Sequence, residues 1–409
     1  MSFPHGAPQE TLLTLYKAAL SAVEGRLSTS RLLESESISG KFYLISVGKS
    51  AASMALGAYD ASGDQIISSF VVTKDESLEE LLSIDNNVQC FQSAHPIPGE
   101  RSLKAGEALL RFIANTPEDS SLLFLISGGT SSLVEVLNDG VSLSELVQAN
   151  EWLLSHGFNI HEINAFRKRI SKIKGGGLLN YLGSRKCSVR LISDVPGNVI
   201  SNIGSGWLFP EVDSVELPIL PKHLAQLVKP ASTKNALTVR VNAKIIANNR
   251  EARQSIAQAA EKMGFEVYSD LAIEVSGDVE QVANELADAL VSGKPGIYVF
   301  GGETTVTLPG NPGRGGRNQQ LALLVADRIK GYDNITFLAA GTDGSDGPTQ
   351  DAGGIVDGTT VGKGLAKNLD VRASLKKADA GAYLEKVGGL IHTGPTGTNV
   401  MDLMLAIKK

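Results

Sequence analysis

The sequence predicts an α/β fold in which strands and helices alternate, arranged as two domains. The first observation is that short apolar runs are followed by helical patterns along most of the chain. The second is the nearly continuous apolar run Ser121–Ile126, which is typical of a strand buried on both faces of a parallel sheet. The third is the proline-rich stretch 210–234, where these patterns weaken and where we place the domain boundary.

In the first part of the chain, each element is predicted from its own pattern. Leu12, Tyr16, Ala19 and Val23 are spaced as on one face of a helix, so the chain is expected to open with an amphipathic helix. Further on, β-branched and aromatic runs predict strands, and segments with helical spacing follow them. The expected strands are Phe42–Val47, Ile66–Thr73, a segment around Cys90, Ser121–Ile126 and Ser188–Ile192, and the expected helices are Ala51–Tyr59, Leu103–Asn115, Leu143–Leu154 and Ile163–Ile173.

After the proline-rich stretch the same alternation resumes. The expected strands are Lys244–Ala247, Phe265–Tyr268, Ile297–Phe300 and Ile335–Ala339, and the expected helices are Arg250–Met263, Val279–Leu290 and one that starts near Gln320. We therefore expect domains formed by residues 1–228 and 229–409.

Composition and charge exclude several classes of partner. A net charge of -6 and a pI near 5.6 do not supply the basic field that nucleic acids and anionic membranes attract. Cys90 and Cys187 have no spacing that suits a metal cluster or a disulfide framework, which indicates a reducing compartment. No signal peptide is apparent, and no run approaches the ~18 apolar residues of a membrane span. We expect a cytoplasmic protein that binds a small molecule; mitochondrial import stays open.

Three strand ends in the first domain carry residues that suit a phosphate group. Lys49 follows the first strand, although an ordinary surface lysine is the simpler interpretation of that position alone. Ser127-Gly128-Gly129-Thr130-Ser131 follows another strand and offers backbone and hydroxyl donors to phosphate oxygens, or else only caps a helix. Asp194 follows a third strand and suits Mg²⁺ or the acceptance of a hydroxyl proton.

A basic cluster lies near the middle of the chain and ends just before Gly175-Gly176-Gly177. Such a cluster is usually a solvated helix face, but in an acidic protein it also suggests an anion site. Its members are Arg167, Lys168, Arg169, Lys172 and Lys174.

The most glycine-rich stretch of the second domain begins with Gly301-Gly302-Glu303 and continues to Arg314 and Arg317, where a helical pattern resumes. Glycines leave backbone N–H groups bare, and arginines add forked donors for a carboxylate or a phosphate. A flexible hairpin connection is the alternative. Asp343 and Asp346 follow the next strand and are candidate metal ligands.

Taken together, these strand ends indicate phosphoryl transfer. In open α/β sheets, ligands bind beyond the carboxyl ends of the strands, so the cations, the donor-rich turns and the carboxylates are expected to share rims. Positioning and neutralisation of charge by such groups is what phosphoryl transfer requires.

The chain also resembles the glycerate 2-kinase family, whose C-terminal part is called the MOFRL domain, from about Tyr43 to Leu403. The resemblance rests on nine segments that occur in order: VGKSAASMA, AHPIPGE, SGGTSSL, NAFRKRISKIKGGGL, SDVPGN with SGW, GGETTV, GRGGRNQQLAL, GTDGSDGPTQDAGG and TGPTGTNVMDL. It implies a Rossmann-like three-layer N-terminal domain with a largely parallel sheet and a smaller, mixed α/β C-terminal domain, with the active site in the cleft between them. It further implies ATP- and Mg²⁺-dependent phosphorylation of D-glycerate at its 2-hydroxyl, which gives 2-phosphoglycerate and ADP.

The resemblance also suggests roles for individual residues. Lys49 and Arg317 match the family's active-site cations, and we expect Arg317, with Lys174, to hold the glycerate carboxylate. The catalytic set is completed by Asp194. The expected ATP-binding residues are Ser127, Gly128, Gly129, Thr130, Ser131, Lys174, Gly302 and Glu303, and the expected Mg²⁺ ligands are Asp194, Asp343 and Asp346.

The chain departs from the family pattern at four positions. Gly99 and Asn198 stand where aspartates are usual, Trp207 replaces a proline, and Thr130 replaces a glycine. The two missing carboxylates weaken the expectation of metal ligation, and a different 2-hydroxy acid substrate stays open. Trp207 is expected to reshape the pocket.

Two other functions are kept as alternatives. One is an NAD(P)-dependent hydroxypyruvate reductase, although the GxGxxG motif that it would need has Asn318 in place of its third glycine. The other is a catalytically altered relative that only binds anions. Association as a homodimer is left open.

Overall fold

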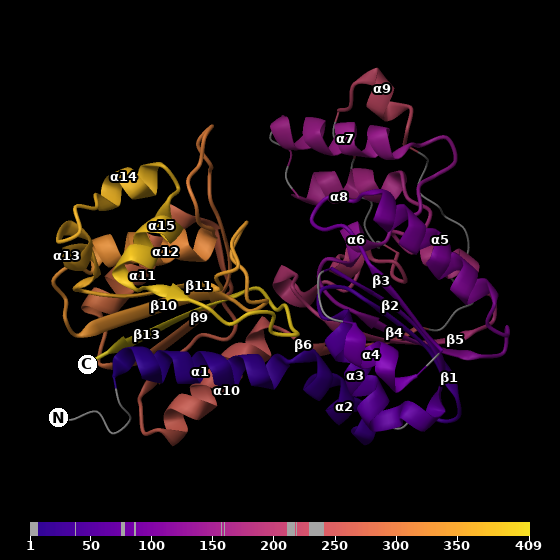
Figure 1. Ribbon diagram of the computed structural model, residues 1–409, viewed down its shortest axis with the longest axis horizontal. Helices are drawn as coiled ribbons and strands as arrows, with labels where there is room; N and C mark the ends of the chain where they lie inside the picture. Colours follow the sequence, from indigo (N-terminus) through magenta and orange to yellow (C-terminus); the bar gives the residue numbers. More distant parts are fainter. Residues whose placement is uncertain are drawn as a thin grey trace. The chain divides into compact units, whose positions relative to one another are not determined.

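The structure, a computed structural model, describes residues 7–36, 38–74, 78–85, 87–156, 158, 160–210, 217, 219–228 and 241–409. These residues form two compact units, each described here by itself. The N-terminal unit comprises residues 25–246, and the C-terminal unit comprises residues 247–409 together with the described residues before Gly25 (Figure 1).

A six-stranded sheet forms the centre of the N-terminal unit, in the order β3-β2-β1-β4-β5-β6. Parallel pairing joins β1 to β2, β2 to β3, β1 to β4 and β4 to β5. The strand order therefore reverses between β1 and β4, and this is where doubly wound folds bind their ligands. The strands are β1 (Phe42–Val47), β2 (Ile66–Thr73), β3 (Val88–Gln92), β4 (Ser121–Ile126), β5 (Lys186–Ile192) and β6 (Val241–Ala247).

Helices cover both faces of this sheet, with α3 on one face and α5 on the other (Figure 1). The three-layer arrangement that the sequence predicted is confirmed. A further layer of helices, α7 to α9, has a small apolar core of its own, which includes Leu146, Phe166 and Leu224. The helices of the unit are α2 (Gly25–Ser35), α3 (Ala51–Ser62), α4 (Glu79–Ile84), α5 (Glu100–Ala114), α6 (Thr130–Leu133), α7 (Leu143–Ser155), α8 (Ile160–Arg169) and α9 (Lys222–Ala225).

The C-terminal unit contains a mixed sheet in the order β12-β11-β10-β13-β9-β7, with β8 also paired to β9. Most of its neighbours are antiparallel, whereas β7 and β8 run parallel to β9. The predicted mixed α/β architecture is confirmed. The strands are β7 (Val267–Tyr268), β8 (Val275–Asp278), β9 (Gly296–Thr305), β10 (Ile335–Gly341), β11 (Gly353–Asp357), β12 (Leu390–Ile391) and β13 (Asp402–Lys408).

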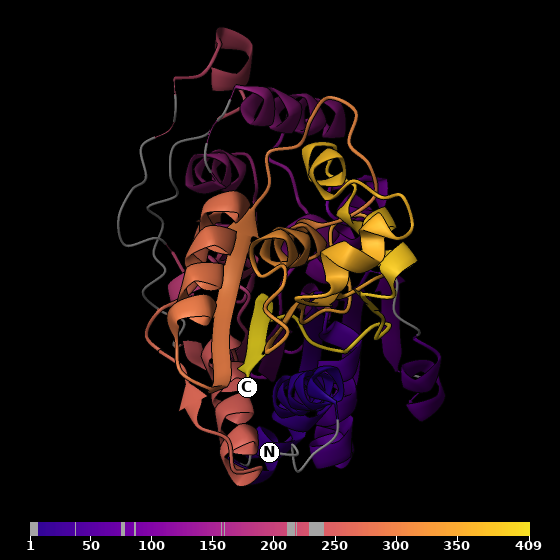
Figure 2. The same cartoon turned by 90° about the vertical axis from the view of Figure 1, so that its left-hand side faces the viewer.

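Two groups of helices cover this second sheet. In Figure 1, α1 and α10 lie below it and α11, α12 and α15 lie above it, and Figure 2 shows the same unit turned toward the viewer, with the yellow strand β13 reaching the C-terminus. The helices are α1 (Pro8–Val23), α10 (Asn249–Lys262), α11 (Val279–Ser292), α12 (Arg317–Arg328), α13 (Thr360–Leu365), α14 (Val371–Lys376) and α15 (Ala380–Val387).

The two units differ from the predicted domains in the placement of α1 and of β6. Helix α1 has the predicted amphipathic pattern, but it packs on α10 and β13 of the C-terminal unit, where the Tyr16 hydroxyl donates to the carbonyl of Gly341 at 2.6 Å. Strand β6, expected to open the second domain, completes the N-terminal sheet instead. A helical pattern identifies a buried face without identifying its partner, which is why the sequence alone did not group α1 with residues 247–409. The predicted boundary at residues 228 and 229 falls at the edge of residues that lie outside the description.

The expected turn at Gly301-Gly302-Glu303 is wrong, because β9 continues through these residues to Thr305. A Cβ on Gly302, whose φ is +146°, would lie 2.0 Å from the carbonyl oxygen of Val275. The glycine is therefore required by the close approach of β8 rather than by a turn. The central strand β13 was not expected either, although Leu403 to Ile407 form an apolar run.

Candidate functional site

The ends of β1 and β4 meet at the point where the strand order reverses, and hydrogen bonds join the turns that follow them. The backbone N–H of Lys49 donates to the carbonyl of Gly128 at 2.8 Å, and that of Ser50 donates to the Ser127 hydroxyl at 3.0 Å. The N–H of Ser127 donates to the Val47 carbonyl at 3.0 Å. The two turns that contain the predicted residues Lys49 and Ser127–Ser131 are thus hydrogen-bonded to each other.

Glycine is needed at two positions where these turns touch. A Cβ on Gly48, whose φ is +136°, would lie 2.1 Å from the Ser127 hydroxyl. A Cβ on Gly129, at φ +85°, would lie 3.1 Å from His95 and 3.2 Å from Lys49. Both the imidazole of His95 and the side chain of Lys49 therefore flank the Gly129 backbone.

The turn that follows β4 keeps backbone donors available. Within the described chain, no hydrogen bond is recorded from the backbone N–H groups of Gly128, Gly129, Thr130 and Ser131. Groups of this kind suit phosphate oxygens. The geometry is consistent with the predicted phosphate-binding turn, whose role stays a prediction.

Thr130 shows why a residue larger than glycine is accepted in this turn. Its side chain is fully buried and donates to the carbonyls of Val47 at 2.8 Å and Ser127 at 2.7 Å. The hydroxyl therefore points back into the protein and ties the turn to β1. Its neighbour Ser131 accepts a hydrogen bond from Ser205 at 2.8 Å.

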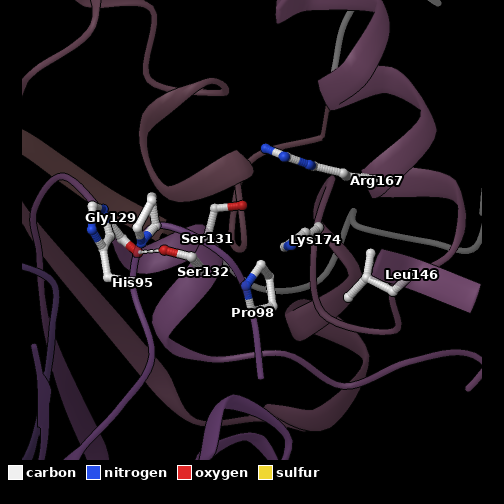
Figure 3. A pocket seen from close by; sticks show the side chains of 9 residues that line it. His95, Pro98, Gly129, Ser131, Ser132, Leu146, Arg167 and Lys174 are labelled. Atoms are coloured by element: carbon white, nitrogen blue, oxygen red, sulfur yellow. Dashed lines mark hydrogen bonds between the residues drawn. The ribbon is translucent and has the colours of Figure 1, made fainter. Parts of the chain in front are cut away.

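A cavity of about 190 Å³ adjoins the turn, entirely within the N-terminal unit. Arg167 and Lys174 extend toward it on one side, and Ser131 and His95 lie on the other (Figure 3). It is lined by His95, Pro96, Pro98, Gly129, Ser131, Ser132, Leu146, Arg167 and Lys174.

Lys174, a predicted site residue, forms a buried ion pair at the wall of this cavity. Its ammonium group donates to Glu135 at 2.5 Å, and the exposed fractions of the two side chains are 1% and 0%. The second oxygen of Glu135 accepts from the Ser171 hydroxyl at 2.6 Å and from the N–H of Val136 at 3.0 Å. Burial lowers the pKa of Lys174, while the Glu135 carboxylate opposes this shift. Glu135 thus fixes the ammonium group in place.

Arg167 is the second cation of the cavity, and the sequence gave it no role of its own. Its Nε donates to the side-chain oxygen of Asn150 on α7 at 2.8 Å. Desolvation lowers its pKa, with an opposing effect of Glu135. The basic cluster therefore includes at least two members that face a cavity rather than solvent.

The predicted metal ligands are divided between the two units, and their joint role stays a prediction. Asp194 follows β5 in the N-terminal unit, whereas Asp343 and Asp346 follow β10 in the C-terminal unit. Among the residues that the structure describes, no three His, Cys, Asp or Glu side chains are grouped so that they could hold a metal ion.

Arg317, the other predicted cation, is held by carboxylates of its own unit. It forms a bidentate pair with Asp402, at 2.5 and 3.0 Å, and a contact of 2.5 Å with Glu303. Burial opposes the charge of Arg317, but these carboxylates outweigh that effect and raise its pKa above the usual value. Asp402 is 1% exposed, so the arginine neutralises an otherwise buried charge.

Asp346 occupies the N-terminus of α12, where the sequence suggested an external anion. Its two carboxylate oxygens accept from the backbone N–H groups of Asn318 at 3.0 Å and Gln319 at 2.8 Å. The N–H groups of Gly313 and Arg314 also have partners within the unit. Burial raises the pKa of Asp346 to about 7. The glycine- and arginine-rich stretch thus binds an anion that belongs to the protein itself.

The other three residues that depart from the family pattern are Gly99, Asn198 and Trp207. Gly99 is the N-cap of α5, and Asn198 adopts a left-handed conformation with φ of 56°, which asparagine tolerates better than most residues. Trp207 is 1% exposed, lies in the main hydrophobic core and is not among the residues that line the cavity. The expected reshaping of the pocket by Trp207 is therefore not supported.

Sequence reasoning missed several residues of these sites. Glu135 stands alone in the apolar run Leu133–Leu137, and a single acid in such a run predicts a buried partner. A single histidine such as His95 is more often structural than catalytic, and Asn150 carries no signal beyond its place on an amphipathic helix. Asp402 belongs to a segment that was quoted only for its resemblance.

Two protein-family models match most of this chain. A family model described as a domain of unknown function (DUF4147) matches residues 11–238, and the MOFRL family model matches residues 296–402. D-glycerate 2-kinase of Thermotoga maritima is 35% identical over 380 residues, which cover 89% of this chain and 90% of the relative. The chain belongs to the glycerate 2-kinase family. The expected enzyme class, a kinase, is thereby confirmed.

Other members of the family extend the match to almost the whole chain. Glycerate 2-kinase of Pyrococcus horikoshii is 34% identical over 422 residues, which cover 96% of this chain and 93% of that protein. The crystal structure of glycerate kinase from Thermotoga maritima superposes with a TM-score of 0.83 at 30% identity and covers 98% of this chain and 99% of that one. None of the helices in the described parts of the chain is sufficiently long and apolar to cross a bilayer.

Proposed function

We propose that the protein transfers the γ-phosphoryl group of ATP to the 2-hydroxyl of D-glycerate, giving 2-phosphoglycerate and ADP. The observation that carries this proposal is the cavity with two cations beside a donor-rich turn, at the strand reversal of a chain from this family. Both substrates are anions, so a site for them needs positive charge and bare backbone donors.

We assign roles to the residues of the N-terminal unit from their positions. The Ser127–Ser131 turn would cradle phosphates of ATP with its backbone N–H groups. Lys49, beside Gly129, would neutralise charge on the transferring phosphoryl group. His95 lines the cavity, and we propose that it accepts the proton of the 2-hydroxyl as the new P–O bond forms and the bond to ADP breaks. This revises the expectation that Asp194 takes that proton.

The residues present would hold Mg²⁺ together with phosphate oxygens of ATP. In phosphotransferases the ion is usually held by one or two carboxylates plus phosphate oxygens, so a site does not require three protein carboxylates. Asp194 is the predicted ligand that lies on the same unit as the phosphate turn, and we keep it in that role. When bound, the ion would neutralise phosphate charge. Asp346 fits this role less well because both of its oxygens cap α12.

The predicted contributions of the C-terminal unit stay proposals. Arg317 is paired with Glu303 and Asp402, and we propose that it stabilises the C-terminal unit rather than binding glycerate directly. The location of the reaction between the two units, the cytoplasmic location and a homodimer likewise remain predictions.

The direct test is ADP production by the purified protein with ATP, Mg²⁺ and D-glycerate, followed by ³¹P NMR of the product. We expect a 2-phosphoglycerate signal. ADP release without a phosphorylated glycerate, or a 3-phosphoglycerate signal in its place, would reject the proposed reaction.

The geometry of the described residues does not favour either alternative function. A nicotinamide-dependent reductase would need a helix N-terminus for the pyrophosphate, and at α12 the Asp346 carboxylate occupies that position. Incubation with NADH and hydroxypyruvate is expected to show no NADH consumption. A relative that only binds anions would be stabilised thermally by ligand and release no ADP.

A further inference from the structure

The side chain of Arg167 is held in one orientation, and its positive charge has no recorded carboxylate partner among the described residues. Its Nε is fixed by Asn150, and the guanidinium extends toward the cavity from α8 (Figure 3). Within the described residues, no ion pair of Arg167 with a carboxylate is recorded. A guanidinium that is oriented through Nε keeps two terminal nitrogens for a planar, bidentate acceptor, and this is the geometry that a carboxylate offers.

The charges around the cavity leave one positive charge uncompensated. Lys174 is neutralised by Glu135 at 2.5 Å, whereas Arg167 has no such partner in the described chain. Arg167 and Lys174 are both desolvated, which lowers the pKa of each. Binding one negative charge would remove the imbalance. A monoanion therefore matches this cavity better than a nucleotide, which carries several negative charges.

The size of the cavity also favours a small acid over a nucleotide. About 190 Å³ is below the roughly 300–1,000 Å³ of sites that hold drug-sized ligands, so the cavity suits an acid of a few carbons. The groups that face the cations include the Ser131 hydroxyl and the His95 imidazole, which can bond to hydroxyls of such an acid. Ser131 also belongs to the proposed phosphate turn, so an acid bound here would lie next to the donor nucleotide.

We propose that Arg167 is the residue that binds the substrate carboxylate, with Lys174 as its neighbour, and that Asn150 and Glu135 are positioning residues for these two cations. This inference rests on the proposed function and names the acid subsite of that site. In this proposal Arg167, and not Arg317, binds the carboxylate of D-glycerate, because Arg317 already pairs with Asp402 and Glu303. Because Arg167 and Asn150 lie on α8 and α7, the helical layer with its own core would carry the specificity for the acid.

The first test measures binding of each substrate separately by calorimetry, so that it does not depend on turnover. Arg167→Lys keeps the charge but removes the fork, and it should weaken D-glycerate binding at least tenfold, the scale of one lost charged hydrogen bond. ATP binding should change less than twofold. Arg169→Lys is the matched control, since Arg169 lies on the same helix but does not line the cavity, and it should leave both affinities unchanged.

Three results would overturn the proposal. The first is an unchanged D-glycerate affinity in Arg167→Lys. The second is a loss of ATP affinity instead of D-glycerate affinity in this variant, which would assign Arg167 to a nucleotide phosphate. The third is an absence of D-glycerate binding in the wild-type protein. If the wild-type protein binds D-glycerate through Arg167 but forms no product, the proposed function fails and the subsite stands.

A second variant tests the positioning role of Asn150. Asn150→Ala should raise the KM for D-glycerate about threefold to tenfold, because Arg167 loses its orienting acceptor, and leave kcat and the KM for ATP within twofold. A fall in kcat with an unchanged KM for D-glycerate would contradict this role. The variant also serves if Arg167→Lys does not fold.

Discussion

Two glycine-rich turns of this protein each lead into a helix, but their backbone N–H groups have different partners. In the turn that follows β4, no hydrogen bond is recorded within the described chain from the N–H groups of Gly128, Gly129, Thr130 and Ser131. In the turn before α12, the N–H groups of Gly313 and Arg314 donate within the unit, and in the first turn of α12 those of Asn318 and Gln319 donate to Asp346. Glycine content alone therefore does not identify a site for an external anion. Such a site also requires that no carboxylate of the protein already accepts hydrogen bonds from its N–H groups.

The predicted catalytic cations differ in the same way. Lys49 lies beside the turn that keeps its donors, and Arg317 lies at the turn that is internally satisfied. We therefore expect substitutions of Lys49 to act mainly on turnover and substitutions of Arg317 to act strongly on stability. Four variants test this contrast.

The largest effect is expected for Lys49→Ala. Loss of a cation that stabilises the transferring phosphoryl group should lower turnover well over 10²-fold, while thermal unfolding stays close to wild type. Steady-state ADP release and calorimetric unfolding measure the two quantities. The matched control is Lys41→Ala, which removes an exposed lysine just before the other end of β1 and should change neither. Near-normal turnover of a folded Lys49→Ala protein would remove Lys49 from this role.

Arg317→Ala should instead destabilise the C-terminal unit by about 2–3 kcal/mol. The substitution leaves Asp402 buried without its partner; the value is below the 3–5 kcal/mol of a fully buried pair because the Arg317 side chain is 35% exposed. Urea denaturation measures the loss. Arg328→Ala, at the other end of α12, removes an exposed pair with Asp288 and should cost less than about 1 kcal/mol. Equal effects of the two substitutions would contradict the structural role of Arg317.

A smaller effect is expected for Thr130→Val. This nearly isosteric change removes the hydrogen bonds to the carbonyls of Val47 and Ser127 and should cost about 1 kcal/mol of stability. Thr14→Val removes an exposed side-chain hydrogen bond to the backbone and should cost less than half as much. If Thr130→Val is as stable as the wild-type protein, the hydroxyl does not tie the turn to β1.

The smallest effect is expected for Gly99→Asp, which restores the family residue at a third turn. Gly99 is the N-cap of α5, and a Cβ there would lie 3.4 Å from that of Ala94, an ordinary contact. Aspartate exceeds glycine as an N-cap by only a few tenths of a kcal/mol, so the melting temperature should rise by about 1 °C. A fall in the melting temperature would show that the position does not tolerate a side chain.

The sequence predicted most of the fold because its strands and helices are locally distinct. Phe42–Val47 and Ser121–Ile126 are strands with the predicted bounds, since nearly continuous apolar runs of that length are typical of buried strands. The partner of α1 and the place of β13 were not predictable in this way. Both depend on pairings between segments that are distant in the sequence, about which local periodicity says nothing.

The candidate site was predicted in outline but not in detail. Glycine and lysine at the ends of β1 and β4 identified the region, because the position of a ligand follows from the order of parallel strands. The partners of the charged residues could not be read from the chain. Glu135 and Lys174 are 39 positions apart, and Arg317 and Asp402 are 85 apart, so each pair becomes visible only when the fold brings its members together.

The most direct test of the contrast between the two turns is an amide-resolved NMR titration of the deuterated, ¹⁵N-labelled protein with a non-hydrolysable ATP analogue and Mg²⁺. We predict that the amide signals of Gly128, Gly129 and Thr130 shift on binding, whereas those of Asn318 and Gln319, which donate to Asp346, do not. Shifts confined to Asn318 and Gln319, with the signals of the β4 turn unchanged, would contradict the account.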